Sequence, residues 1–228
     1  MRTWPASTYG FGYTNGALQA KAEVGFNAHP AFPDLNSRYE SAELFPLFQN
    51  RVMNPNRKNF RDYLASLELT RGDAIDILSV TGGERQTDSF EVFPKIDRAK
   101  DGSVISRFFI RGMRHLAAAS QARALALKPG EELGVSVELN DTATRAEILL
   151  STRSDYQFVG WAPHYLVTDL LSAITERPQV TAKVIRVNPD DVPANRRVLI
   201  EFGCTLPEAI LPMSSKAFQL ITAAPREH

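Results

Sequence analysis

The segment from Val104 to Lys128 holds the side chains whose types and spacing most clearly indicate a chemistry. It contains five basic residues and no acidic one: Arg107, Arg111, Arg114, Arg123 and Lys128. Guanidinium groups donate paired hydrogen bonds to phosphate oxygens, so the segment could bind the backbone of a nucleic acid. The alternative is a solvated strand face on which arginines recur at alternate positions. Because the chain has 26 basic and 26 acidic residues, any surface that binds anions must be a local patch.

Residues that could catalyse a reaction or hold a metal show no recognisable pattern. The four histidines, His29, His115, His164 and His228, lack the spacing of zinc ligands. No glycine-serine nucleophile elbow and no phosphate-binding glycine loop occurs. Asp190 and Asp191 lie in a proline-containing turn, where we expect them to be exposed. We therefore expect a protein that is not an enzyme and that uses no cofactor or metal.

Length and composition limit the class of protein. With 228 residues, of which 43% are hydrophobic, the chain can bury the cores of about one to two domains. The single cysteine, Cys204, lies in an apolar alternating run, so we expect a core residue and no disulfide framework. No apolar run reaches about 18 residues, and the N-terminus lacks the apolar segment of a signal peptide. We infer a cytoplasmic protein without a membrane span.

Residues 1–94 are expected to form a small α+β subdomain. Aromatic residues alternate with glycines from Tyr9 to Tyr13, which predicts a strand, and Asn15-Gly16 favours a turn after it. The stretch from Gly25 to Tyr39 has the composition of a loop. Ser41 is a candidate cap for a short helix that follows.

Two clearer helices and a strand complete this subdomain. Asn56 is a candidate cap for a helix whose apolar residues recur at helical spacing and predict one buried face. Asp73 can cap a second helix, which should stop at the pair Gly82-Gly83. A short strand is expected from Phe90 to Phe93. The apolar residues of the first helix are Phe60, Tyr63, Leu64 and Leu67.

A polar linker, 95–103, separates this subdomain from a second domain, 104–228. Residues Leu133 to Leu139 alternate between apolar and polar, the pattern of a strand with one buried face. Five or six short strands with two helices predict an OB-like barrel, a fold often used to bind single-stranded nucleic acid. The expected strands are Val104 to Arg111, Leu133 to Leu139, Ala146 to Leu150, Tyr156 to Trp161, Val180 to Val187 and Val198 to Phe202. The expected helices are Leu116 to Leu127 and Pro163 to about Ile174.

Residues 8–94 resemble the N-terminal subdomain of HipA-type kinases. The resemblance rests on the run LFPLFQNRVM at 44–53, the helix after it, the run DAIDIL at 73–78, the pair Gly82-Gly83 and the closing strand. No kinase lobe follows, so the resemblance implies neither ATP binding nor phosphoryl transfer. It implies a docking module, of the kind that occurs as a separate antitoxin subunit beside a truncated HipA-like kinase. The alternative is a shared fold without a kinase partner.

Residues 104–174 resemble the HIRAN domain, a modified OB barrel found in DNA-repair helicases and in standalone bacterial proteins. The resemblance rests on Gly112-Met113-Arg114-His115, a helix, Gly130, a strand ending near Asn140, Ala146, Val159-Gly160 and a terminal helix. It implies an α+β fold with an OB-like barrel that binds the 3′ hydroxyl end of single-stranded DNA. The remaining tail is similar to the extension of the standalone bacterial forms.

The HIRAN resemblance implies roles for individual residues. Arg114 matches an arginine that contacts the DNA backbone, and His115 stands where the family often has a base-stacking tyrosine. Asn140 matches the asparagine of the family's Asn-Pro-x-Asp-x-x-Ala signature. Thr142 and Ala143 replace the aromatic residue and the aspartate that bind the last base and its hydroxyl.

Two further residues follow the glycine of the Val159-Gly160 pair. Trp161 and His164 occupy the stretch where the HIRAN family places residues that contact DNA. An exposed Trp161 could stack on a base, which contributes about 1–3 kcal/mol of binding free energy. The alternatives are a Trp161 packed under the following helix and a His164 that is merely a surface residue.

Two hypotheses of function follow. In the first, the barrel binds single-stranded DNA or DNA ends through Arg111, Arg114, His115, Asn140, Trp161 and His164. In the second, the protein is an antitoxin-like module that docks and restrains a HipA-like kinase, and DNA binding has been lost. The two are compatible, because a barrel that senses DNA could control a module that binds a kinase.

Overall fold

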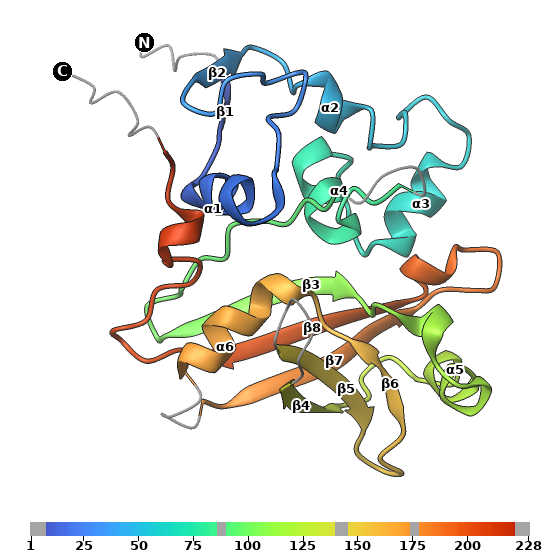
Figure 1. Ribbon diagram of the computed structural model, residues 1–228. Helices are drawn as coiled ribbons and strands as arrows, with labels where there is room; N and C mark the ends of the chain where they lie inside the picture. Colours follow the sequence, from blue (N-terminus) through green and yellow to red (C-terminus); the bar gives the residue numbers. More distant parts are fainter. Residues whose placement is uncertain (1–7, 86–89, 140–145, 174–177, 222–228) are drawn as a thin grey trace. The chain divides into compact units, whose positions relative to one another are not determined.

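The computed structural model of the protein describes residues 8–85, 90–139, 146–173 and 178–221 (Figure 1). The fold is α+β, as the sequence predicts, and within these ranges eight strands form three antiparallel sheets. The chain divides into two compact units. Unit 1 comprises residues 1–51 and 213–228, and unit 2 comprises residues 52–212. No helix in the described ranges is long and apolar enough to cross a membrane.

Unit 1 is built on a two-stranded sheet and an aromatic core. Strand β1 (Tyr9–Gly12) pairs antiparallel with strand β2 (Arg38–Ser41). Phe11 stacks on Phe32 with ring centroids 3.8 Å apart, and the Tyr13 hydroxyl donates a hydrogen bond of 2.8 Å to the Phe32 carbonyl. The buried side chains of this core are Tyr13, Phe32 and Leu35.

Segments from both ends of the chain form unit 1. The 3-10 helix η5 (Lys216–Phe218) leads into residues that pair with the segment after β1. The Asn15 N–H donates a hydrogen bond of 2.8 Å to the Gln219 carbonyl. The Ile221 N–H donates one of 2.9 Å to the Tyr13 carbonyl. The unit therefore depends on contacts between residues about 200 positions apart in sequence.

Unit 1 also contains a helix that the sequence did not predict. Asn15 and Gly16, expected as a turn, instead begin helix α1 (Asn15–Val24). The residues after them are mainly Ala, Leu, Gln, Lys and Glu, all strong helix formers, and they outweigh the turn signal. Ser41 likewise lies in β2 instead of capping a helix. The short helix α2 (Pro46–Gln49) begins at a proline, which needs no N–H partner there.

The helices of unit 2 follow the sequence expectations closely. Helix α3 (Phe60–Ser66) begins after Asn59 and not after Asn56, and it buries Tyr63 as expected. Helix α4 (Ala74–Thr81) is capped by Asp73, whose carboxylate accepts a hydrogen bond of 2.8 Å from the Ile75 N–H. It ends at Gly82, where φ is 70°. The strand expected at 90–93 does not form, although the Val92 N–H donates to the Gly82 carbonyl.

Two three-stranded antiparallel sheets form the rest of unit 2. One has the order β3-β8-β7 and the other the order β4-β5-β6. The strands of the first are β3 (Ser103–Phe109), β7 (Val180–Val187) and β8 (Val198–Thr205). The strands of the second are β4 (Leu133–Leu139), β5 (Ala146–Thr152) and β6 (Phe158–Trp161). The helices of this part are η1 (Met113–His115), α5 (Ala118–Leu125), η2 (His164–Leu166), α6 (Val167–Ala173) and η4 (Ala194–Arg196).

Two isolated bridges connect the sheets of unit 2. Arg111, just after β3, pairs with Trp161 of β6, and Glu132, just before β4, pairs with Lys183 of β7. The core of the sheets includes Cys204, which is buried as predicted. The alternation in β4 is weaker than expected: Leu133 is fully buried, but Leu139, at the other end of the strand, is 76% exposed.

The boundary between the two units does not lie in the expected linker, 95–103. Helices α3 and α4 belong to unit 2, where their apolar faces pack in one cluster with the strands. Because Tyr63 and Ile77 share this cluster with Phe109 and Leu199, the boundary lies after Arg51. Apolar packing sets the boundary of a compact unit, and a polar stretch of sequence does not by itself separate two cores.

Candidate nucleic-acid interface

Four of the expected site residues, Arg111, Arg114, His115 and Trp161, lie where the end of β3 meets β6. We call this place the β3–β6 corner (residues 110–116 and 158–161). Arg111 and Trp161 exchange two backbone hydrogen bonds, of 2.9 and 3.1 Å. Gly160 has φ of 141°, and a Cβ there would lie 2.6 Å from the Arg111 carbonyl oxygen. Glycine therefore permits the close approach of the two chain segments. The fold thus joins the Gly112 and Gly160 motifs, which are far apart in sequence.

Trp161 is packed into this corner and does not stand free. Its indole ring lies directly against Gly112, where φ is 70° and a Cβ would collide with the ring. The Phe158 ring meets it edge-on, with centroids 4.6 Å apart. The indole is half-buried, and its Nε1 is buried without a hydrogen-bond partner among the described residues. Trp161 therefore shapes the corner, because at least one face of its ring is covered.

Arg111 forms ion pairs within the protein. Its guanidinium lies 2.5 Å from the Glu91 carboxylate and 3.6 Å from that of Glu84, and its side chain is 30% exposed. Asn195 of η4 donates a hydrogen bond of 3.0 Å to Glu84. This charge is compensated by two carboxylates, so it is less available to a phosphate than the sequence suggests. Glu84 and Glu91 both lie more than one helical or strand repeat away from Arg111 in the sequence, so no local sequence pattern connects them with it.

Arg114 and His115 present an exposed basic pair on η1. The Arg114 Nε donates a hydrogen bond of 3.0 Å to His115 Nε2. Met113 and Leu116, on either side, are buried and anchor the short helix. Among the described residues no carboxylate lies within ion-pair distance of Arg114. The guanidinium can therefore donate to an external anion, while the imidazole beside it offers an aromatic face.

The remaining expected residues are less well placed. His164 is exposed on η2, three positions after Trp161, and no interaction connects it with Arg114 among the described residues. Asn140, Thr142 and Ala143 lie outside the described residues. The corner thus brings together Arg111, Trp161 and the Arg114–His115 pair. Within the described ranges, no group of His, Cys, Asp or Glu side chains is arranged to hold a metal ion.

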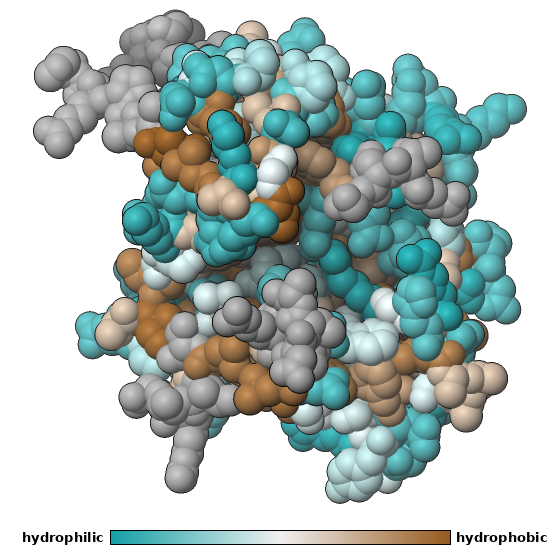
Figure 2. Space-filling view, viewed as in Figure 1, coloured by the Kyte–Doolittle hydropathy of each residue, from teal (hydrophilic) through white to brown (hydrophobic). Residues whose placement is uncertain are grey.

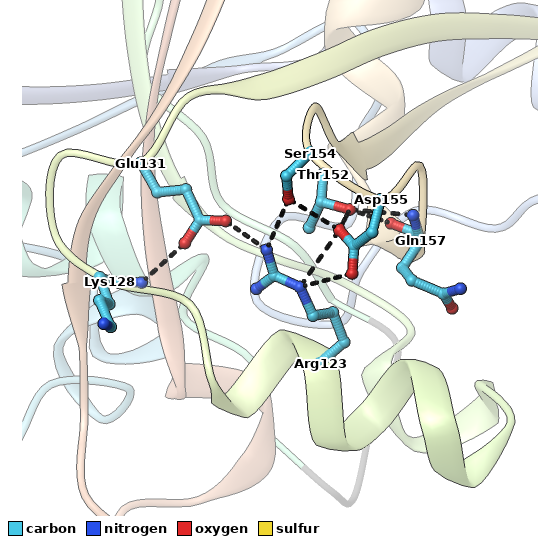
Figure 3. A network of polar contacts seen from close by, with 7 residues as sticks. All are labelled: Arg123, Lys128, Glu131, Thr152, Ser154, Asp155 and Gln157. Carbon is cyan, nitrogen blue, oxygen red and sulfur yellow. Dashed lines mark hydrogen bonds and ion pairs between the residues drawn. The ribbon is translucent and has the colours of Figure 1, made fainter.

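Another basic residue of the acid-free segment serves a structural network. The Arg123 guanidinium lies between two carboxylates, 2.5 Å from Glu131 and 3.1 Å from Asp155 (Figure 3). Asp155 also accepts a hydrogen bond of 2.5 Å from the Thr152 hydroxyl. These contacts tie the end of α5 to the turn between β5 and β6. Arg107 is likewise paired, 2.7 Å from Glu201.

The Arg123 network has a pH-dependent contribution to stability. The pKa of the Asp155 carboxyl lies below its usual range, chiefly because Thr152 donates to it, helped by Ser154 and Arg123 and opposed by desolvation. A carboxyl with a lowered folded pKa stabilises the fold above its unfolded pKa of about 3.9, and this contribution is lost as pH falls through the folded value. We expect Asp155→Asn to lower the free energy of unfolding at pH 7, with a deficit that narrows below about pH 4. Urea unfolding of the parent and the variant at a series of pH values measures the deficit at pH 7 and its change at lower pH. A deficit that stays constant with pH would contradict this prediction.

Comparison of the chain with family models, curated proteins and solved structures found no match.

Proposed function

We propose that this protein binds single-stranded DNA or DNA ends, without catalysis, at the β3–β6 corner. The observation that carries the proposal is the exposed Arg114–His115 pair, in which the guanidinium has no carboxylate partner among the described residues. A cation that the protein does not neutralise contributes most to the free energy of binding a phosphate, because binding then releases counterions of the nucleic acid. Arg111 and Trp161 support the pair by fixing the backbone beneath it.

The arrangement of the strands supports a HIRAN-like role. The Arg111–Trp161 and Glu132–Lys183 bridges join the margins of the two sheets, which favours an OB-like barrel for residues 104–205. In the HIRAN family, which residues 104–174 resemble, the DNA end lies against the segment that corresponds to Arg114 and His115. The replacement of the family's aspartate by Ala143 favours contacts with the backbone over recognition of the 3′ hydroxyl.

Arg114→Gln is expected to weaken binding of single-stranded DNA roughly tenfold, since a hydrogen bond to a charged group contributes about 1.5 kcal/mol. The plot of log affinity against log salt should become shallower by about 0.7, the value for one phosphate contact. Fluorescence anisotropy with labelled oligonucleotides at low and moderate salt measures both. Strands with a free 3′ hydroxyl, strands with a 3′ phosphate and blunt duplex should be compared.

Lys100→Gln is the matched control for Arg114→Gln. Lys100 is exposed in the turn before β3, and that strand of 7 residues separates it from the corner. At about 3.3 Å per residue the strand is roughly 23 Å long, so this lysine should not share the site. An Arg114→Gln variant that binds with the parent's affinity and salt dependence would overturn the proposal.

A second function is favoured by unit 1. Helix α1 buries none of its residues, and the apolar side chains of Leu18, Val24 and Phe26 are exposed, Val24 by 80%. Large exposed apolar side chains are a feature of surfaces that bind protein partners. We propose as the alternative that unit 1 docks a HipA-like kinase that lacks its own N-terminal subdomain. Co-purification with such a kinase tests this role; failure to bind it would leave the nucleic-acid role alone.

A further inference from the structure

A second basic surface lies on and before helix α3. From Leu44 to Arg61 the chain has no acidic residue, and within unit 2 this stretch contains Arg57, Lys58 and Arg61. All three are exposed. None of their side chains has an ion-pair or hydrogen-bond partner among the described residues, in contrast to those of Arg107, Arg111 and Arg123. These three charges are therefore as available to an external anion as that of Arg114.

The acidic residues around α3 do not cancel this charge. Asp62 is exposed in the first turn of the helix and is the one acid that directly adjoins Arg61 in the sequence. Glu68, just beyond the helix, is already bound to Arg186 at 2.7 Å. The surface thus retains an excess of positive charge, although the whole chain is neutral.

Arg196 connects this surface with the β3–β6 corner. It lies on η4, which packs against η1, the helix of Arg114 and His115. Its guanidinium stands over the ring of Tyr63 on α3, 5.3 Å from the ring centroid. All these elements belong to unit 2. Hydrophilic side chains predominate at the upper right of Figure 2, where α3 lies in the view of Figure 1.

The backbone under Arg196 is held in place by a buried asparagine. Asn188 is 2% exposed, and its Nδ2 donates to the carbonyls of Arg196, at 2.8 Å, and of Ser66, at 3.0 Å. One side chain thus fixes η4 to the end of α3. The position of Arg196 between the two basic surfaces is therefore set by the fold and not by a mobile loop tip.

We propose that Arg57, Lys58, Arg61 and Arg196 form an α3–η4 basic row that binds the phosphates of a nucleic-acid strand continuing from the Arg114–His115 pair. This inference rests on the proposed function and adds to it the length of strand that is bound. A single strand suits such a row because its flexible backbone can follow several cations in succession, and each neutralised phosphate releases counterions. Arg57, Lys58 and Arg61 belong to the segment 52–66, outside the part of the chain that resembles a nucleic-acid-binding domain.

The length of the bound strand provides the test. The parent should bind an oligonucleotide of about 18 nucleotides several-fold more tightly than one of about 6. This ratio of affinities should exceed the statistical gain from a longer strand, which is measured with the R57Q/K58Q variant. The double variant R57Q/K58Q should lose about fivefold to tenfold in affinity for the long strand and flatten its salt dependence by about 1.4. Its affinity for the short strand should stay that of the parent.

The control K95Q/K100Q removes two exposed lysines and the same net charge, from the segment before β3. It should bind both strands like the parent. If R57Q/K58Q and the control have equal affinities for the long strand, the basic row is refuted, while loss of short-strand binding in Arg114→Gln still supports the corner. Equal losses of R57Q/K58Q on both lengths would also refute the row as an extension. If Arg114→Gln affects neither strand, the proposed function itself fails.

Discussion

Gly160→Ala is expected to lower the free energy of unfolding by about 3 kcal/mol, through both backbone strain and overpacking. With φ of 141°, this position has a conformation that side chains with a Cβ rarely adopt. The added methyl group would also collide with the Ile110 side chain and lie 2.6 Å from the Arg111 carbonyl oxygen. Neither neighbour can move freely, because Ile110 is 1% exposed and Arg111 is bonded to Trp161. Urea unfolding followed by circular dichroism measures the change.

Gly130→Ala separates the two causes. Gly130 has φ of 90°, so alanine is strained there as well, but nothing lies within 4 Å of the added Cβ. We expect this variant to lose only about 1 kcal/mol, from the backbone conformation alone. If the two variants are equally stable, the close contact between β6 and the segment after β3 does not exist as described, and the β3–β6 corner is wrong.

Asn188→Ala is expected to destabilise the protein by about 2–3 kcal/mol, because it leaves buried polar groups without partners. The Nδ2 of Asn188 donates to two carbonyls, and its Oδ1 accepts a hydrogen bond of 2.8 Å from the Arg186 Nε. Alanine removes all three bonds and creates a small cavity. Thermal and urea unfolding give the loss of stability, and the wild-type protein provides the reference.

Asn195→Ala is the control for Asn188→Ala, since it removes the same side chain from the same loop region. Asn195 is exposed and makes a single hydrogen bond to Glu84. We expect a change of no more than about 0.5 kcal/mol, as for most exposed positions. Comparable losses in both variants would show that the burial of Asn188 is not what makes it important.

Local signals in the sequence predicted the local structure well. Helix α4 is the clearest case, since Asp73 caps it and Gly82 ends it, and both effects act within one helical turn. Strands β5, β7 and β8 likewise lie where apolar residues alternate. Helix α1 was missed because a strong turn signal, Asn15-Gly16, stands at its start, and neither signal alone decides between a turn and a helix.

The candidate site was predictable only in part. The exposed Arg114–His115 pair lies where the motif indicated, because η1 follows directly from Gly112. The ion pairs of Arg111 could not be foreseen, since Glu84 and Glu91 lie 20 or more residues earlier and approach only through tertiary packing. The position of Arg196 over the Tyr63 ring could not be foreseen either, because no sequence pattern connects these two distant segments.

Unit 1 has a consequence for the order in which the protein folds during synthesis. Its β1 segment is made before unit 2, but the residues that pair with Tyr13 and Asn15 are Ile221 and Gln219, which are made after unit 2. Unit 2 is contained in the intervening sequence, 52–212, and can form its core earlier. The aromatic cluster of Phe11, Tyr13 and Phe32 therefore lacks Ile221, which packs against it, until unit 2 has been made. In that interval it exposes apolar surface on which non-native contacts can form.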